Sequence, residues 1–168
     1  FIGPARRDSQ GSRPYGISDC TPDVLEMLDL LQEKAGRVLL KLSPMLDWRK
    51  AVSDLGKQHV REVHIVSVGN ECKELLLMLG KGEGMRLVCV NDYSVFEAHK
   101  ADEPTGAKPD EPNKPQQGGF LFEPNASIMK AGCFEELSQH FGISQIAQNS
   151  HLFVAARLID GFPGRVFQ

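Results

Sequence analysis

The sequence predicts an α/β protein in which a parallel sheet covered by helices ends in an antiparallel hairpin and is followed by a small α+β segment. Two strand–loop–helix units occupy residues 1–56, and this is the repeating unit of a parallel sheet. Strand-like runs with short, glycine-containing connections follow over residues 63–90, and short connections favour antiparallel pairing. A proline-rich stretch then separates this part from a second globular pattern that begins at Phe120.

The composition is that of an ordinary globular protein, with 41% hydrophobic and 24% charged residues. The net charge of −3 provides no global attraction for nucleic acid or anionic membranes. The longest apolar run, Leu75–Leu79, is far shorter than the roughly 20 residues of a membrane span. The cysteines are scattered, with no CxxC pattern and no histidine at ligand spacing. We therefore expect reduced, buried thiols, no metal site, no membrane span and a cytoplasmic location.

The first residues, Phe1 and Ile2, are apolar and strand-prone, and they run directly into a polar loop that begins at Gly3. This pattern is typical of the last residues of a buried strand. The chain also stops within a strand-like run, residues 165–168. We therefore expect further sequence on both sides of this chain.

A complete helix pattern follows over residues 20–36. Thr21 is predicted as the N-cap, Pro22 suits the first helical position, and Gly36 supplies the stop. The apolar side chains at helical spacing form one stripe, which comprises Val24, Met27, Leu28 and Leu31.

Arg37–Leu42 predicts a short buried strand that ends at Ser43, because the residue before a proline avoids helical backbone. Asp47 is then predicted to cap a second helix, which Gly56 closes.

The middle of the chain predicts strands over Val63–Val68, Leu75–Leu79 and Arg86–Val90, each paired antiparallel with the next. Residues 96–119 contain four prolines, mixed charge and almost no apolar content. Such a segment cannot bury enough surface to fold alone, so we interpret it as a linker or a long exposed loop. Residues 1–95 and 120–168 are therefore predicted as separate globular parts.

The last part predicts a short strand over Phe120–Phe122 and a helix capped by Asn125 or Ser127. Two further strand-like runs follow at residues 143–147 and 151–158. The apolar helical stripe that precedes these two runs comprises Ile128, Met129, Phe134, Leu137 and Phe141.

Several long segments in a fixed order resemble one bacterial family: FIGPARRD, LLKLSPMLDWRKAV, VREVHIVSVGNECKELLLML, FLFEPNASIMKAGCF and NSHLF. The family is that of class I S-adenosylmethionine-dependent methyltransferases, typical of Bacteroidetes, that continue into ferredoxin-like and THUMP-like modules. The resemblance implies that residues 1–95 form the C-terminal half of a Rossmann-like sheet with strand order 3-2-1-4-5-7-6, beginning at its fourth strand. Residues 120–168 would then be the start of the ferredoxin-like or THUMP-like module. The glycine-rich loop and the acidic residue that hold the cofactor would lie upstream of Phe1.

The resemblance also places the candidate catalytic residues in the loop after the fourth strand, at Gly3, Pro4, Ala5 and Arg6. Family members look like Asp-Pro-Ala-Arg-Arg at this point, where a side-chain carboxylate or amide and a backbone carbonyl receive the target nitrogen. Gly3 stands in the place of that Asp. It keeps the backbone acceptors but removes the carboxylate, which would have accepted a hydrogen bond or a proton.

Arginines near the start of the chain are candidate substrate-binding residues. We interpret Arg6, Arg7 and Arg13 as ligands for substrate phosphates, because the guanidinium group binds phosphate in a bidentate manner. The alternative is a solvated loop, or salt bridges to Asp8 and Asp19.

The loop after Arg37–Leu42 supplies a second group of candidates. Ser43 and Asp47 could border a substrate pocket, and Trp48 could stack on a base. We favour the alternative in which Asp47 only caps a helix and Trp48 belongs to the core. Lys41 lies on a buried strand, so its ammonium group must reach water or a partner at the strand end, where it could line the cleft.

In the last part, Asn125 and Lys130 could contact RNA at a helix start, although capping by Asn125 and a solvated Lys130 are the favoured alternative. We interpret His64, His140 and His151 as structural or surface residues. The GxG patterns at residues 80–84 are predicted to form a turn between strands.

The resemblance implies methyl transfer from S-adenosylmethionine to RNA, because THUMP-like modules usually bind RNA. The alternative is a non-catalytic RNA- or protein-binding module, in which Gly3 carries no chemistry. An open strand edge at Phe1, Ile2 and Val38–Leu42 further predicts a homodimer.

Overall fold

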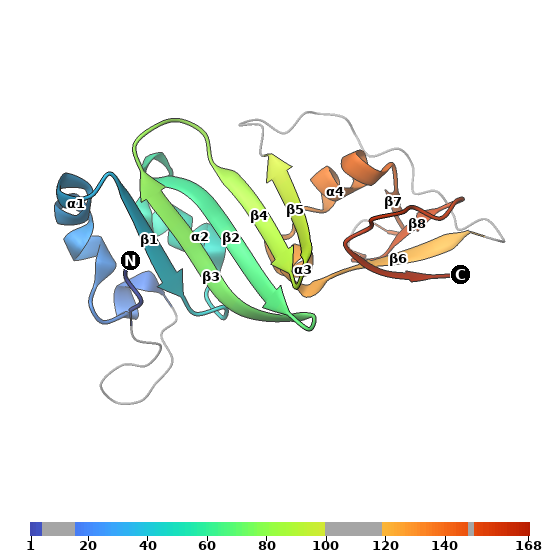
Figure 1. Cartoon of the computed structure of the whole chain (residues 1–168), viewed down its shortest axis with the longest axis horizontal. Helices are drawn as coiled ribbons and strands as arrows, with labels where there is room; N and C mark the ends of the chain where they lie inside the picture. Colours follow the sequence, from blue (N-terminus) through green and yellow to red (C-terminus); the bar gives the residue numbers. More distant parts are fainter. Residues whose placement is uncertain (5–15, 100–118, 148–149) are drawn as a thin grey trace.

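The computed structural model describes residues 1–4, 16–99, 119–147 and 150–168. The described residues form a five-stranded sheet of order β1-β3-β2-β4-β5 and a four-stranded sheet of order β7-β8-β6-β9. Figure 1 shows the two sheets side by side, with the N-terminus at one end of the molecule and the C-terminus at the other. The mixed α/β architecture that the sequence predicts is therefore present.

The five-stranded sheet comprises β1 (Arg37–Leu42), β2 (Val60–Val68), β3 (Glu71–Gly80), β4 (Arg86–Asn91) and β5 (Ser94–His99). β3 lies between β1 and β2 and is antiparallel to both. β2 and β4 are parallel, and β4 and β5 form an antiparallel hairpin. Ile2 adds a single parallel bridge to Leu40 at the outer edge of β1. As a result β1, β2 and β4 run in one direction while β3 and β5 run in the other (Figure 1).

One predicted pairing is wrong. We expected β3 to pair with β4 because a short connection joins them, but β4 pairs with β2. Both edges of β3 are already occupied by β1 and β2, so β4 can add only to the free edge of β2. The glycine-containing connection crosses the start of β2, where Arg61 donates a hydrogen bond to the Gly84 carbonyl oxygen at 2.9 Å.

The two helices that flank β1 in sequence begin with aspartate caps. α1 (Val24–Lys34) is capped by Asp23, which accepts a hydrogen bond from the Leu25 backbone N–H at 2.8 Å. Capping by Thr21, with Pro22 as the first helical residue, is therefore wrong, because Asp23 offers a carboxylate closer to the first apolar residue. α2 (Trp48–Leu55) is capped by Asp47 and ends at Gly56, as predicted. Gly56 has φ +84°, a conformation that favours glycine. Short 3₁₀ turns lie at Ile17–Asp19 and Lys57–His59.

The four-stranded sheet comprises β6 (Phe120–Pro124), β7 (Ser144–Gln145), β8 (Phe153–Ala155) and β9 (Gly164–Phe167). β6 pairs antiparallel with β8 on one side and with β9 on the other, and β7 pairs with β8. α3 (Ala126–Ala131) and α4 (Phe134–Phe141) connect β6 to β7. The strand that we predicted at Phe120–Phe122 is confirmed, whereas β7 and β8 are shorter than the predicted runs.

The predicted linker overlaps a strand at its start. β5 extends to His99, so residues 96–99 of the predicted 96–119 segment belong to the five-stranded sheet. They do so because Phe96 and Ala98 are buried, at 6% and 1% exposure. Residues 100–118 of that segment lie outside the described residues.

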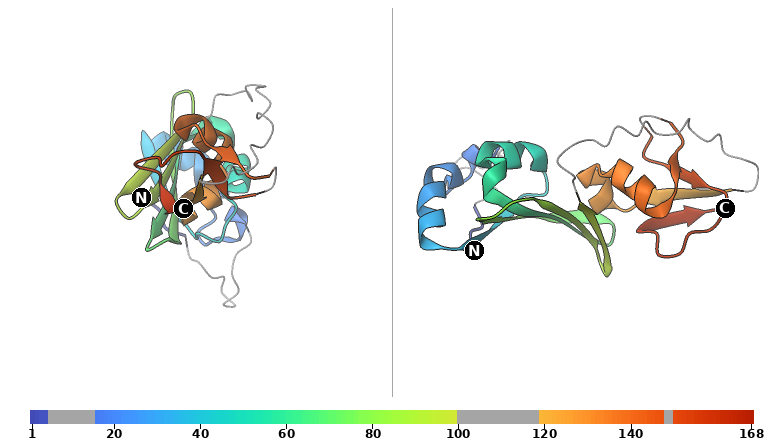
Figure 2. Two further views of the ribbon diagram at one scale, coloured as in Figure 1. Left: turned by 90° about the vertical axis from the view of Figure 1, so that its right-hand side faces the viewer. Right: turned by 90° about the horizontal axis from the view of Figure 1, so that it is seen from above.

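Helices cover one face of the five-stranded sheet. Figure 2 shows the helices together on one side of this sheet. α3 follows β6 in sequence but packs against β2, β3 and β4. The opposite face carries the side chains that alternate with the core residues, such as Lys41, Leu76 and Met78, which are half-buried.

A single core runs through both sheets. It contains Ile65 and Leu77 of the five-stranded sheet as well as Phe122 and Phe153 of the four-stranded sheet. A chain of aromatic rings joins the two parts: Phe96 stacks on Phe141 at 6.1 Å, Phe141 contacts Phe162 at 5.6 Å, and Phe162 contacts Phe122 at 5.0 Å. Among the described residues, no helix is long and apolar enough to cross a membrane.

Candidate functional site at the carboxyl edge of the five-stranded sheet

The carboxyl ends of the parallel strands meet at one edge of the five-stranded sheet. Gly3 follows the bridge at Ile2, Ser43 follows β1, Gly69 follows β2, and Asp92 follows β4. Ligands of open α/β sheets bind outside the carboxyl ends of the strands. We name this edge, with the loops that leave it, the carboxyl edge.

Gly3 lies directly beside β1. The Ile2 N–H donates to the Leu39 carbonyl at 2.9 Å, and the Lys41 N–H donates to the Ile2 carbonyl at 2.9 Å. These two bonds fix the backbone that leads into Gly3 and the buried Pro4. A Cβ atom at Gly3 would lie 3.7 Å from Lys41 Cε and from the Phe1 ring, which are ordinary contacts. The position therefore has room for a side chain.

Lys41 extends across the open face of the sheet toward this position. Its Nζ lies 3.5 Å from Glu74 Oε1 of β3, and the two side chains are 39% and 28% exposed. The sequence left open whether the ammonium group reaches water or a partner, and in the structure Glu74 is that partner. The Lys41 side chain thus lies beside Gly3, and its ammonium group pairs with the Glu74 carboxylate of the neighbouring strand.

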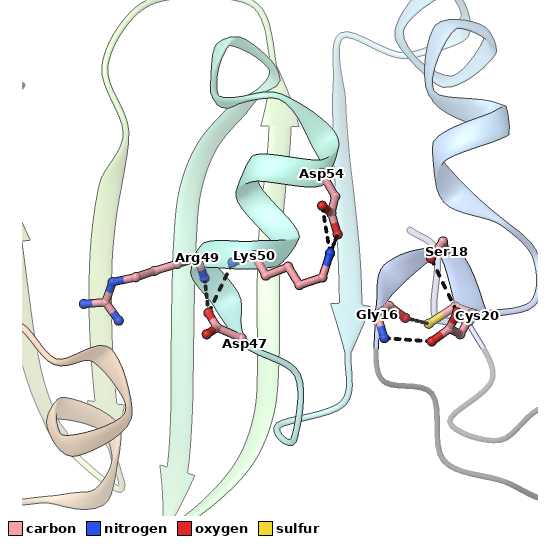
Figure 3. A network of polar contacts seen from close by, with 8 residues as sticks. Gly16, Ser18, Cys20, Asp47, Arg49, Lys50 and Asp54 are labelled. Carbon is pink, nitrogen blue, oxygen red and sulfur yellow. Dashed lines mark hydrogen bonds and ion pairs between the residues drawn. The ribbon is translucent and has the colours of Figure 1, made fainter.

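The loop after β1 makes mainly structural contacts. Ser43 Oγ accepts a hydrogen bond from the Met45 N–H at 3.3 Å, and Asp47 Oδ1 accepts from the N–H groups of Arg49 and Lys50 at 2.7 and 3.2 Å. Figure 3 shows Asp47 below the start of α2, with Arg49 extending away from it. The structure thus gives Asp47 the capping role that the sequence favours.

Trp48 belongs to the core and is only 3% exposed. Its indole N–H donates to the Ala131 carbonyl at 3.3 Å, and the Arg49 guanidinium lies 4.5 Å from the ring centroid. Stacking on a substrate base is therefore incompatible with this arrangement, because the ring is already covered. The apolar surroundings of α2 explain why the residue is buried.

Asn125 and Lys130 also have partners within the protein. Asn125 caps α3, and its Oδ1 accepts from the N–H groups of Ser127 and Ile128. Lys130 Nζ donates to the Leu46 carbonyl at 3.0 Å. The structure does not support a solvated Lys130, because the carbonyl lies within reach of its long side chain. Neither residue is brought to the Gly3 end of the carboxyl edge.

Arg49 is a residue that the sequence reasoning missed. Its guanidinium donates to the Ala131 carbonyl at 2.8 Å, alongside the Trp48 indole. The last carbonyl groups of a helix lack partners within the helix and attract cations. No sequence pattern identified this contact, because it joins residues 82 positions apart.

Ala5, Arg6, Arg7 and Arg13 lie outside the described residues, and so does Asp8. The described part of the chain resumes at Gly16, whose N–H donates to Asp19 Oδ2 at 2.9 Å (Figure 3). Cys20 Sγ lies 3.6 Å from the Gly16 carbonyl oxygen. Burial raises the pKa of the Cys20 thiol, and the charges of Asp19 and Asp23 add to this effect.

Two turns at the carboxyl edge are tied together and to α3. The Gly69 N–H donates to Asp92 Oδ1 at 2.9 Å, and the Asn70 N–H donates to Asn91 Oδ1 at 3.1 Å. Asn70 Oδ1 in turn accepts from the Ala126 N–H at 2.7 Å. Asn70 and Asp92 have φ +61° and +52°, which these residue types tolerate better than most. The sequence predicted a turn at Gly69 but not its contact with α3.

The three histidines that the sequence analysis considered have structural partners. His64 Nε2 lies 2.8 Å from Glu62 Oε2, His140 contacts the Phe96 ring, and His151 contacts the Phe134 ring. The Arg86 guanidinium, followed by His64, lowers the pKa of the Glu62 carboxyl. Within the described ranges, no group of three or more metal-ligating side chains could hold an ion. The GxG pattern at residues 80–84 lies between β3 and β4, as predicted.

Known proteins resemble the chain in two ways. Residues 120–163 match the family model of a ferredoxin-like domain. The whole chain is also similar to the crystal structure of a "putative methyltransferase" from Porphyromonas gingivalis W83, with 29% identity and a TM-score of 0.82. That similarity covers 99% of this chain and 41% of the Porphyromonas chain, so this chain spans about two fifths of its relative. No curated protein matches the sequence.

Proposed function

We propose that this chain is part of a class I S-adenosylmethionine-dependent methyltransferase that acts on RNA, and that residues 1–95 form the C-terminal half of its catalytic domain. The observation that carries the proposal is the similarity to the Porphyromonas protein over 99% of this chain, at 29% identity. The ferredoxin-like match at residues 120–163 agrees with the module that follows the catalytic domain in the family that the sequence resembles.

The strand order supports the same assignment. Ile2, β1, β3 and β2 lie side by side in that order, and β3 is antiparallel to its neighbours. This arrangement agrees with the 4-5-7-6 end of the strand order in the resembled family. In this placement Gly3 follows the fourth strand, where the target nitrogen would be received.

Only the target side of a catalytic site can be assigned to residues of this chain. When bound, S-adenosylmethionine supplies the methyl group. The glycine pattern at residues 80–84 forms the connection between β3 and β4, so it offers no cofactor loop. The backbone around Gly3 would accept hydrogen bonds from the target amine, and the Lys41–Glu74 pair would border it. Arg6, Arg7 and Arg13 would bind phosphates of the RNA.

The glycine at position 3 also favours the alternative, in which the chain is a non-catalytic RNA- or protein-binding module. The site lacks the carboxylate that family members carry at this position, and Glu74 is engaged with Lys41. A protein with this site could retain substrate binding after the loss of catalysis.

Methyl transfer from labelled S-adenosylmethionine to bacterial RNA, by the product of the complete reading frame that encodes this chain, tests the proposal. The Gly3→Asp variant restores the carboxylate in a position with room for it, and we expect the rate to rise on the order of a hundredfold. Gly36→Asp is the matched control, because a side chain there meets nothing within 4 Å. Absence of transfer by all three proteins would support the alternative.

The isolated 168-residue chain should not bind S-adenosylmethionine, because the resemblance assigns the residues that hold the cofactor to sequence outside it. Isothermal titration calorimetry checks this expectation. Binding in the micromolar range would contradict the placement of the strands in the family fold.

We also propose that the isolated 168-residue chain, without the preceding strands that the resemblance implies, forms a homodimer through the outer edge of β1. Among the described residues, Ile2 alone pairs with this edge, and the Phe1 side chain is 78% exposed. An open strand edge tends to recruit another chain. Light scattering over a concentration series should detect the dimer, and Phe1→Lys should weaken it. A protein that stays monomeric throughout the series would overturn the proposal.

A further inference from the structure

Two cysteine thiols from different parts of the chain lie in contact inside the core. Cys89 belongs to β4, and Cys133 is the N-cap residue of α4. Their Sγ atoms are 3.9 Å apart, and the residues are 1% and 2% exposed. Cys20 and Cys72, the remaining cysteines, hydrogen-bond instead to the carbonyl oxygens of Gly16 and Ala126.

The two sulfur atoms are close enough to be joined by a modest movement. A disulfide bond is about 2.05 Å long, so the sulfur atoms must approach by about 2 Å. Cys133 lies in the connection between α3 and α4, which can shift more readily than Cys89 in the middle of a paired strand. The movement required is therefore on the scale of side-chain and loop adjustment.

We propose that Cys89 and Cys133 form a redox modification site, in which a peroxide converts the two thiols into a disulfide that fastens the ferredoxin-like region to the five-stranded sheet. One thiol attacks the O–O bond of the peroxide and becomes a sulfenic acid, which releases one water from hydrogen peroxide. The sulfur of the second thiol then displaces the hydroxyl group as a second water and forms the S–S bond. The two thiols lose two electrons and two protons, and the peroxide is reduced to water.

The surroundings of the pair determine when the reaction occurs. The hydrogen bond with Cys133, followed by burial, raises the pKa of the Cys89 thiol. Because the thiolate is the nucleophile, Cys89 reacts slowly at neutral pH, and the buried pair stays reduced in a reducing compartment. The disulfide consequently marks sustained oxidation rather than a brief pulse.

The crosslink closes a ring of residues 89–133, which joins β4 to the start of α4. A disulfide that closes a long ring stabilises a protein by restricting its unfolded chain. We expect the Tm of the oxidised chain to exceed that of the reduced chain by roughly 5–10 °C. This inference is independent of the proposed methyltransferase function.

The experiment treats the 168-residue chain with hydrogen peroxide under native conditions and then blocks the free thiols with N-ethylmaleimide in denaturant. Intact mass spectrometry and peptide mapping identify the oxidised residues. In the wild type we expect a loss of two hydrogen masses and a crosslinked peptide pair that contains Cys89 and Cys133. Cys72→Ser is the matched control and should form the same crosslink, whereas Cys133→Ala should not form it.

Peptide mapping on the wild type shows whether Cys89 and Cys133 form the disulfide, even where a cysteine variant folds poorly. The proposal is overturned when Cys89 and Cys133 both react with N-ethylmaleimide after oxidation of Cys20 or Cys72. It is also overturned when the crosslink forms only between Cys72 and another cysteine. If the crosslink between Cys89 and Cys133 forms but the Tm does not change, the disulfide does not fasten the ferredoxin-like region to the five-stranded sheet.

Discussion

The five-stranded sheet and the ferredoxin-like region differ in where their helices pack. α1 and α2 lie beside β1 in sequence and cover the sheet that contains it. α3 follows β6 directly, yet it packs against β2, β3 and β4. The family match begins at residue 120, but the packing boundary does not coincide with it. A segment can therefore resemble a separate domain in sequence while its helix completes the core of the preceding sheet.

The two regions are joined by hydrogen bonds from side chains to backbone carbonyl groups. Trp48 and Arg49 share the Ala131 carbonyl, and Lys130 reaches the Leu46 carbonyl in the opposite direction. Such contacts stabilise a helix end that would otherwise leave its carbonyl groups unpaired. We expect the two regions to unfold together, and the following changes test how strongly they are joined.

The largest expected effect comes from Trp48→Ala. The change removes a buried aromatic side chain and its hydrogen bond to Ala131, and it should lower the free energy of unfolding by about 3–5 kcal/mol. Urea unfolding followed by far-UV circular dichroism measures this loss. Tyr93→Ala is the control, because Tyr93 is fully exposed and its loss should cost no more than about 0.5 kcal/mol.

Hydrogen exchange in the same variant tests the coupling. Amides of Ala126–Ala131 should lose protection together with those of β2 in Trp48→Ala. Unchanged protection in Ala126–Ala131 would show that the regions are separate folding units.

A comparison of the two N-caps gives an intermediate effect. Asn125 is 6% exposed and accepts hydrogen bonds from two N–H groups and from Ser127 Oγ at 2.7 Å. Asp47 is exposed and accepts from two N–H groups. Asn125→Ala should cost about 2 kcal/mol and Asp47→Ala about 1 kcal/mol in chemical denaturation. Equal losses would mean that burial of the cap contributes little.

Adjacent cations on α2 give a smaller difference. Arg49→Ala should lower the free energy of unfolding by about 1–2 kcal/mol, because it removes a hydrogen bond at 2.8 Å to Ala131. Lys50→Ala removes only the exposed pair with Asp54 and should cost about 0.3–0.5 kcal/mol (Figure 3). Thermal unfolding of the two variants side by side measures the contrast. Similar losses of stability in the two variants would show that the Arg49 hydrogen bond does not help to join the two regions.

The smallest effect is a pH dependence that belongs to the five-stranded sheet alone. Arg86 and His64 lower the pKa of Glu62 from its usual value of 4.5. Its contribution to stability is therefore present above pH 4.5 and is lost as the pH falls through the lower folded-state pKa. Glu62→Gln should make the free energy of unfolding less dependent on pH below 4.5. Identical profiles in the two proteins would exclude this contribution.

Most features set by neighbouring residues could be predicted from the sequence, although the cap of α1 is Asp23 and not Thr21, and features set by distant residues could not. The capping roles of Asp47 and Asn125 follow from the side chains at helix starts. The partner of Lys130 lies 84 positions away, and no local pattern identifies it. The pairing of β4 with β2 also depends on which strand edges remain free, which short connections alone do not determine.

The candidate site divides in the same way. The resemblance placed Gly3 in the loop after a strand, and the position of Lys41 on its own strand suggested that it could line the cleft. That the two lie close together was seen only in the structure. Lys41 can pair with Glu74 only because β3 lies beside β1. No local sequence pattern predicts this strand pairing, so none could identify Glu74 as the partner of Lys41.

The position of β3 has a consequence for the order in which the sheet can assemble. β3 lies between β1 and β2 but is synthesised after both of them. β1 therefore cannot join the rest of the sheet until β3 has formed. The β2–β3 hairpin is a suitable nucleus for this step, because its loop comprises only Gly69 and Asn70. We expect truncation of Leu77 to slow folding and truncation of Leu40 mainly to speed unfolding, as φ-values from stopped-flow kinetics would show. In a growing chain, the edge of β1 that faces β3 would then stay unpaired until β3 emerges from the ribosome.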